Sequence, residues 1–371
     1  MKRLSLLFLF LLVGCSGLAQ KETYTLRLIG DFAFEPKTTF EEIPFGGISG
    51  ITYDKKTKRL IGISDDRSQR GPARFYEFDL QISESVFDIK INTQVILRAA
   101  NQSPFKKGEV DFEGIAQTPS GDLIISSEGD NRMTPRIPPS LMMFSKEGFY
   151  KGWIAVPDRY LPEHKGETTK GPRNNMAFES LGITKEGKYL FTGTEDTMVQ
   201  DGELTSLSKP GVIRIARFKR KDAGFVFNDE FAYPLEKIPA IEGHSETRGV
   251  NGLVEIVPMS KNHFFTMERA WTPENRKQTI KIFKVTIESD STDVSSISSL
   301  KGSKYRPVKK VLIADLDDYI PLLTAGKKKL DNIEGLALGP KLKNGNHTLI
   351  VISDDNFNKR QRTMLMAFEI L

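Results

Sequence analysis

Short apolar runs recur along the chain, separated by polar turns. Five of them share a similar opening, at residues 47–51, 111–115, 177–181, 250–253 and 332–336. Each is followed by a turn and by a second apolar run that ends on acidic residues, at 61–66, 123–128, 190–196, 264–268 and 349–355. Apolar runs this short, bounded by turn residues, predict β-strands. The pattern therefore predicts five copies of a repeat built from strands.

An all-strand repeat on this scale is typical of a β-propeller. The intervals between copies hold two further β-rich runs, such as 73–78 and 89–95 in the first copy, so each repeat predicts a four-stranded blade. The last copy has only three strands, and the N-terminal run 24–30 can supply the fourth. Pairing the first strand with the last blade closes the ring and removes an exposed edge.

We therefore expect an all-β fold in which residues 23–371 form a single β-propeller domain of five four-stranded blades. Six blades is the alternative, because the two longest intervals could hide a degenerate blade. The Ser-rich stretch 289–303 predicts a surface loop in the fourth repeat.

Residues 1–19 have the features of an export signal. Lys2 and Arg3 precede an apolar run at 4–13 that is too short to cross a bilayer. Residues 12–15 resemble a bacterial lipobox, which predicts lipidation of Cys15, and the alternative is ordinary signal cleavage near Ala19. Both hypotheses predict an exported protein, either lipid-anchored or periplasmic in a bacterial cell envelope, or secreted. Membrane contact is expected only through the N-terminal lipid.

Composition narrows the function classes. The 53 Lys and Arg residues exceed the 48 Asp and Glu residues by only five, without the clustered basic face that nucleic acid requires. A single cysteine excludes a disulfide framework and a Cys-rich metal site. The four histidines have no metal-ligand spacing, and no GxSxG motif is present. A monomer that acts on a small molecule is the expectation.

The repeat also predicts where the acidic residues gather. In an antiparallel blade the first strand crosses from one face to the other and the second returns, so the start of one and the end of the other share a face. This topology brings eight carboxylates to one mouth of the central channel: Asp65, Glu113, Glu128, Glu179, Glu195, Glu268, Glu334 and Asp354.

Carboxylates this close repel one another and need a counter-charge. Hard oxygen donors favour Ca²⁺ over zinc. The other candidate counter-charge is arginine, whose planar fork suits carboxylate or phosphate. Five arginines are predicted in the loops of the same face: Arg67, Arg132, Arg173, Arg248 and Arg269.

Any one of these acids could instead be architectural, accepting hydrogen bonds from a neighbouring blade. However, Ser49 and Asn251 replace the first-strand Glu in two copies. An asymmetric ring of this kind favours a ligand site over a purely structural role.

Several motifs together resemble the phytase-like family described by an "esterase-like activity of phytase". They are residues 111–115, 173–181, 332–336 and 352–363, and the resemblance extends from about Leu28 to Ile370. It implies an exported propeller that hydrolyses phosphate or carboxylic esters. Calcium-dependent propeller phytases are similar in architecture, with carboxylates that hold Ca²⁺ at the channel mouth and basic residues that bind phosphate.

From this resemblance and the acidic ring we expect metal-assisted hydrolysis of a small phosphorylated or ester substrate. The seven expected Ca²⁺ ligands are Asp65, Glu113, Glu128, Glu195, Glu268, Glu334 and Asp354. The five arginines would bind the phosphoryl oxygens, and Glu179, which follows an Arg-Asn-Asn segment, would orient the attacking water. The alternatives are a carboxylesterase and a non-catalytic cell-envelope protein that binds a ligand or serves as an interaction platform.

Overall fold

The computed structural model describes residues 23–222, 224–242, 248–325 and 328–371. The predicted export signal with Cys15 lies outside the described residues, so lipidation and export stay predictions. Among the described residues, no helix is both long enough and apolar enough to cross a membrane.

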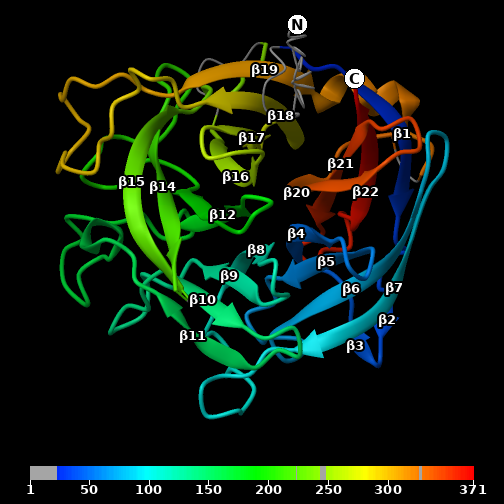
Figure 1. Cartoon of the computed structure of the whole chain (residues 1–371). Coiled ribbons are helices and arrows are strands. Elements are labelled where there is room, and N and C mark those ends of the chain that lie inside the picture. The colour runs from blue at the N-terminus through cyan, green and yellow to red at the C-terminus, as the bar shows by residue number, and fades with distance from the viewer. Residues whose placement is uncertain (1–22, 223, 243–247, 326–327) are drawn as a thin grey trace, which may run out of the picture.

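The strands form five four-stranded antiparallel sheets, arranged around a central axis as the blades of a propeller (Figure 1). The first blade consists of β4 (Ile48–Asp54), β5 (Arg59–Ser64), β6 (Arg74–Ile82) and β7 (Phe87–Ile96). The second consists of β8 (Phe112–Gln117), β9 (Leu123–Ser127), β10 (Ser140–Phe144) and β11 (Tyr150–Ile154). The third consists of β12 (Phe178–Ile183), β13 (Tyr189–Thr194), β14 (Val212–Lys221) and β15 (Gly224–Pro234).

The fourth blade consists of β16 (Val250–Pro258), β17 (His263–Thr272), β18 (Lys277–Thr286) and β19 (Lys309–Asp315). The fifth consists of β20 (Asn332–Lys341), β21 (His347–Asp354), β22 (Met364–Ile370) and β1 (Leu26–Ala33). The innermost strands β4, β8, β12, β16 and β20 surround the axis, each in contact with the next. Five blades are confirmed, and the described residues hold no sixth.

The N-terminal strand closes the ring, as predicted. β1 pairs antiparallel with β22, from Leu26 opposite Ile370 to Ala33 opposite Met364. The closing strand begins two residues later and ends three residues later than the run 24–30. Because β22 is paired with β21 on one side and with β1 on the other, the C-terminal strand is not an open sheet edge.

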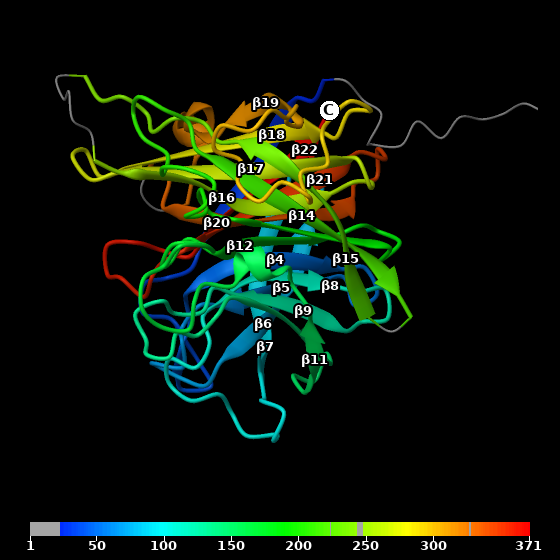
Figure 2. The same cartoon turned by 90° about the vertical axis from the view of Figure 1, so that its left-hand side faces the viewer.

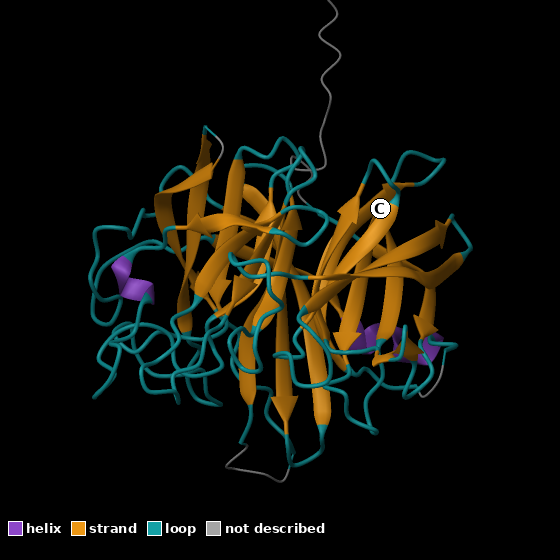
Figure 3. Cartoon of the chain, turned by 90° about the horizontal axis from the view of Figure 1, so that it is seen from below, coloured by secondary structure: helices purple, strands orange, loops and turns teal. Residues whose placement is uncertain are grey.

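The hydrophobic core lies between adjacent blades. Phe75 of the first blade packs in one cluster with Phe112 and Phe144 of the second, and all three are almost completely buried. The rings of Phe112 and Phe144 meet edge to face with centroids 5.9 Å apart. Figures 2 and 3 show the strands running between two loop-bearing faces of the propeller. The apolar faces of the sheets thus hold the blades together while the strand ends reach the two faces.

A few small elements lie outside the five blades. They are the hairpin of β2 (Thr39–Phe40) and β3 (Ile43–Pro44), and the 3-10 helices η2 (Asp158–Tyr160) and η3 (Leu316–Leu322). The Ser-rich loop between β18 and β19 differs from the expected surface loop, because Val294 and Leu300 are buried against Ala232 of the third blade. The loop therefore ties the fourth repeat to the third.

Candidate functional site

One mouth of the propeller is shaped by a bulge near the start of every inner strand. The pairing of the first and second strands is interrupted at equivalent positions in all five blades. The residues in these bulges are Ser49, Glu113, Glu179, Val254 and Glu334. Where the second strand ends, opposite the start of the first, the equivalent positions carry Asp65, Glu128, Glu195, Arg269 and Asp354.

The fourth blade corrects two sequence assignments. Its bulge lies at Val254, so Val254 rather than Asn251 replaces the first-strand Glu. Arg269, opposite Gly252, occupies the position that is acidic in the other blades. Glu268 precedes it and belongs to a different environment.

Glu268 is a structural acceptor outside the ring. Its carboxylate accepts hydrogen bonds from Tyr233 Oη at 2.7 Å, Glu236 N at 2.8 Å, Asn251 Nδ2 at 3.0 Å and Lys310 Nζ at 2.7 Å. These four donors satisfy both of its oxygens, so the arrangement does not place Glu268 among the candidate metal ligands.

The remaining carboxylates form what we call the acid ring. Six of them feel the charge of another member, Asp111 and Glu334 raise the pKa of other members, and burial disfavours the ionised form of all eight. The acid ring consists of Asp65, Asp111, Glu113, Glu128, Glu179, Glu195, Glu334 and Asp354.

Asp111 is a member that the sequence prediction missed. It lies opposite Glu128, whose backbone N donates to the Asp111 carbonyl at 2.9 Å. The corresponding positions in the other blades are uncharged, namely Gly47, Ala177, Gly252 and Asn332. The sequence feature that could have identified Asp111 as a member of the ring is its position immediately before Phe112-Glu113.

Three acids of the ring form a tight cluster. Carboxylate oxygens of Asp111, Glu113 and Glu128 all lie within 4.8 Å of one another. Glu128 accepts a hydrogen bond from Ala177 N, but its Oε2 is buried with no hydrogen-bond partner, as are Asp111 Oδ1 and the neighbouring Asp65 Oδ1. Buried acceptors without donors are costly, and a cation bound by these oxygens would relieve that cost.

Two of the five predicted arginines lie within the ring. Arg67 forms an ion pair with Asp111 and donates to Asn175 Oδ1 at 2.7 Å. Arg269 Nη2 bridges Glu195 Oε1 at 3.1 Å and Glu334 Oε1 at 3.0 Å. These guanidiniums compensate only part of the negative charge.

The other three arginines lie elsewhere. Arg132 is close enough to influence the charge of Asp111, but it pairs with Asp130 at 3.0 Å and its side chain is 63% exposed. Arg173 donates to the carbonyl oxygens of Thr197 and Gly202, and these contacts fix a loop. Arg248 is exposed, and its backbone N donates to Glu274.

The acid ring holds its protons at unusually high pH. Burial raises the pKa of Asp111 to about 6 despite its ion pair with Arg67, and it raises the pKa of Glu195 to about 7. The pKa of Glu113 is raised well above its usual range by burial and by the charge of Glu179. Burial, followed by the charges of Glu128, Glu195 and Glu334, does the same to the pKa of Glu179. The site therefore favours protons or a metal cation in place of bare negative charge.

Fold and site together define a five-bladed propeller with an acidic, arginine-containing channel mouth. The family model described as "Phytase-like: Esterase-like activity of phytase" matches residues 43–357. The chain belongs to this phytase-like family, which confirms the resemblance found in the sequence and supports a hydrolase.

Solved structures resemble the chain only distantly. An endo-arabinase from Bacteroides thetaiotaomicron VPI-5482 has 14% sequence identity and a TM-score of 0.43, covering 90% of this chain and 96% of that one. An ancestral GH74 enzyme has 10% identity and a TM-score of 0.34, covering 86% of this chain and 35% of that one. No match was found among curated protein sequences.

Proposed function

We propose that the protein is a metal-assisted hydrolase of small phosphoesters and that the acid ring is its active site. One observation carries the proposal: within the described part of the chain, eight largely buried carboxylates share a channel mouth with only two guanidiniums, Arg67 and Arg269. Unpaired charge of this kind destabilises a fold unless a bound ligand compensates it. Membership of the phytase-like family supports ester hydrolysis as the chemistry.

Asp111, Glu113 and Glu128 are the residues that would hold the metal. They offer three carboxylates whose oxygens lie within 4.8 Å of one another, and oxygens without donors are available on Asp111, Glu128 and the adjacent Asp65. An all-oxygen donor set fits Ca²⁺. What a bound Ca²⁺ supplies is Lewis acidity, which polarises a phosphoryl oxygen and lowers the pKa of water.

Glu179 is the proposed general base. Its charge acts on Glu113 in the metal cluster, and it also interacts with Glu195, Glu334 and Arg269 on the other side of the ring. A carboxylate with a raised pKa is a stronger base than an ordinary glutamate whenever it is ionised. It would accept a proton from the attacking water as the new P–O bond forms and the ester P–O bond breaks, and the departing alkoxide would take a proton from solvent.

Arg67 is the proposed phosphate ligand. Its side chain is 23% exposed, whereas that of Arg269 is 12% exposed and engaged with two carboxylates. Arg132, at the rim, could take a further phosphoryl oxygen. Arg269 is better described as a positioning residue, because it fixes Glu195 and Glu334.

Activity measurements on chelator-treated protein test the proposal. Release of p-nitrophenolate from an aryl phosphate and from an aryl acetate would be followed as Ca²⁺ is added back. We expect calcium-dependent turnover of the phosphate. Glu179→Gln should lower kcat by about 10²-fold or more, because general base catalysis contributes on that scale, while its melting temperature shows that the fold is kept.

Glu268→Gln is the matched control, since it removes a buried acid next to Arg269 in β17 but lies outside the ring. It should keep the calcium dependence of turnover. Calcium binding without turnover of either ester would favour the alternative of a non-catalytic binding protein. Turnover of the acetate alone would favour a carboxylesterase, and activity indifferent to chelation would contradict metal assistance.

A further inference from the structure

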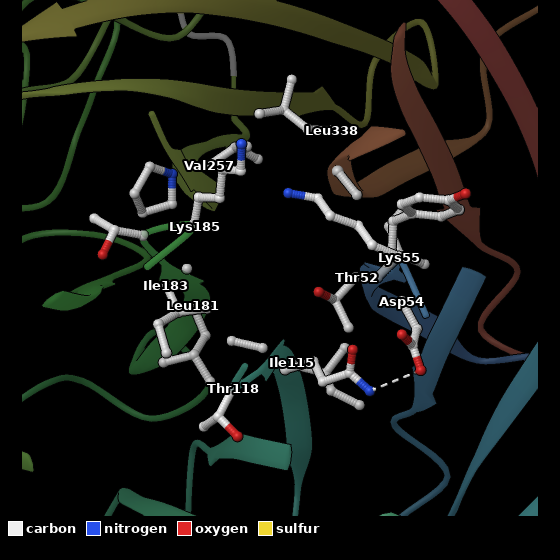
Figure 4. A pocket seen from close by; sticks show the side chains of 18 of the residues that line it. Thr52, Asp54, Lys55, Ile115, Thr118, Leu181, Ile183, Lys185, Val257 and Leu338 are labelled. Atoms are coloured by element: carbon white, nitrogen blue, oxygen red, sulfur yellow. Dashed lines mark hydrogen bonds between the residues drawn. The ribbon is translucent and has the colours of Figure 1, made fainter. Parts of the chain in front are cut away.

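The opposite mouth of the propeller contains a cavity of about 320 Å³ (Figure 4). It lies at the far ends of the five inner strands, and side chains from every blade line it. The mouth with the acid ring is at the other ends of the same strands. The cavity is therefore distinct from the proposed active site.

Neighbouring inner strands approach each other closely at positions between the two mouths. A Cβ atom at Gly50 would lie 2.5 Å from the carbonyl oxygen of Glu113, and one at Gly114 would lie 2.7 Å from that of Glu179. Glycine at these positions lets neighbouring inner strands approach closely. Glu255 occupies the equivalent position in the fourth blade, where its Oε1 accepts from Leu181 N at 3.0 Å.

The wall of the cavity is mainly aliphatic. Ile115, Leu181, Val257 and Leu338 line it, with Thr52 and Thr118 as polar groups among them (Figure 4). The volume is at the lower end of the range of small-molecule sites. The lining suits a compact apolar body.

Two lysines bring positive charge to this apolar space. Lys55, from the β4–β5 hairpin, and Lys185, from the β12–β13 hairpin, line the cavity and project their ammonium groups toward the same opening (Figure 4). Neither ammonium forms an ion pair or hydrogen bond within the part of the chain that the structure describes. Partial burial and the charge of Lys185 lower the pKa of Lys55, although Glu186 opposes this effect.

The nearby carboxylate does not neutralise the lysines. Asp54 also lines the cavity, but it accepts hydrogen bonds from Lys56 N at 2.7 Å and from Gln117 Nε2 at 3.2 Å. Lys56 donates its own Nζ to the Pro119 carbonyl. His347 is a further nearby group, and its pKa is lowered by burial and then by the charges of Lys341, Lys55 and Lys185. The charge at this mouth is thus opposite in sign to that of the acid ring.

From this cavity we infer a second ligand site, which binds a small amphiphilic anion. The apolar body of the ligand would pack against the aliphatic wall of the cavity, and its carboxylate or phosphate headgroup would lie between Lys55 and Lys185. Both headgroups share the chemistry that the two ammonium groups recognise. The metal-free acid ring would repel the same ligand.

Calorimetric titration of chelator-treated protein tests this inference with probes below their micellar concentrations, because no metal is then present in the acid ring to bind octyl phosphate. Octanoate, octyl phosphate, octanol and octylammonium share an apolar body and differ in headgroup. We expect one molecule of either anion to bind, octanol at least tenfold more weakly, and octylammonium not at all. The relative affinities of octanoate and octyl phosphate show whether the site prefers a carboxylate or a phosphate headgroup. Equal affinity for octanol and octanoate would overturn the proposal.

Variants locate the binding. The double variant Lys55→Gln and Lys185→Gln should weaken anion binding at least tenfold. Lys58→Gln with Lys188→Gln removes two lysines from the same hairpins but not from the cavity lining, and it should bind normally. Loss of binding in both double variants, or in neither, would contradict the assignment. Glu113→Gln should leave octanoate binding intact, so that failure here is distinguishable from failure of the proposed hydrolase.

Discussion

Buried carboxylates occur in two contrasting regions of this propeller. On the third blade, Asp201 and Glu230 are completely buried around Arg214, whose guanidinium reaches Asp201 at 2.7 and 2.8 Å and Glu230 at 3.0 Å. Arg159 adds a second positive charge beside Glu230, at 3.4 Å. The acid ring has eight carboxylates for two arginines. The buried acids around Arg214 are paired with guanidiniums, whereas most acids of the ring are not, and this surplus of carboxylates favours a ligand in the ring.

The Arg214 cluster also has a structural task. Arg214 donates to the carbonyl oxygens of Val294 at 3.1 Å and Ile297 at 2.8 Å, which fastens the loop between β18 and β19 to the third blade. Asp201 accepts from Leu300 N at 2.8 Å in the same loop. Every charged group there has a partner that explains its presence.

The largest expected effect is on the paired region. Arg214→Met should lower the free energy of unfolding by about 3–5 kcal/mol, because it leaves Asp201 and Glu230 buried with far less compensation. Chemical denaturation would measure the loss. A change below about 1 kcal/mol would show that the cluster is not needed for stability.

The next effect concerns metal binding to the acid ring. Ca²⁺ at 100 times its dissociation constant should stabilise the chelator-treated protein by about 2.7 kcal/mol, by mass action alone. Thermal melts with and without Ca²⁺ would show this as a rise in Tm. Glu113→Gln should remove the rise, whereas Arg214→Met should keep it as long as the variant folds.

Replacing one acid by its amide should change the free energy of unfolding in opposite directions for a structural acid and for an acid of the ring. Glu268→Gln weakens charge-assisted bonds to four donors and should lower stability by about 1–3 kcal/mol. Glu113→Gln removes a repelled carboxyl and should raise the stability of the metal-free protein by about 1 kcal/mol. Parallel urea titrations would compare the two. Equal losses in both variants would mean that ring acids and structural acids do not differ.

The pH dependence of stability provides the finest test. The pKa values of the ring acids are raised in the folded state, to about 6 for Asp111 and about 7 for Glu195. The folded metal-free protein then binds more protons than the unfolded chain, so the stability that these protons contribute is fully present below about pH 4 and is lost as the pH rises through about 6 and 7. Each proton contributes a slope of up to about 1.4 kcal/mol per pH unit.

Denaturation at pH 5 and pH 8, with and without saturating Ca²⁺, would measure this slope. Saturation with the metal should flatten or reverse it, because the cation replaces the protons. A metal-free protein that is more stable at pH 8 than at pH 5 would contradict the raised pKa values.

Much of this architecture could be predicted from the sequence. Repeated apolar runs and their acidic ends predicted five blades, closure by the N-terminal strand, and the gathering of acids at one mouth, because strand direction alone determines which ends meet. The family resemblance came from the same motifs. These features depend on local pattern and topology, which the sequence displays directly.

The finer assignments depended on register, which the pattern does not display. In the fourth repeat, Asn251-Gly252-Leu253 imitates the motif of the other copies, yet the bulge lies at Val254 and brings Arg269 rather than Glu268 to the ring. A displacement by one residue moves a strand side chain to the opposite face. The Arg214 cluster joins residues from separate segments of the chain, and no local sequence pattern predicts that these residues come together.

The central claim is that the surplus of carboxylates in the acid ring exists to bind a metal cation. Its most direct test is calorimetric titration of chelator-treated protein with Ca²⁺ near pH 6.5, repeated in two buffers of different ionisation enthalpy. We predict saturable binding with release of about one proton or more, because the acids that receive the metal are partly protonated. Glu113→Gln and Glu128→Gln should abolish binding, and Glu268→Gln should retain it. An absence of binding in the unmodified protein, or binding unaffected by both ring variants, would contradict the claim.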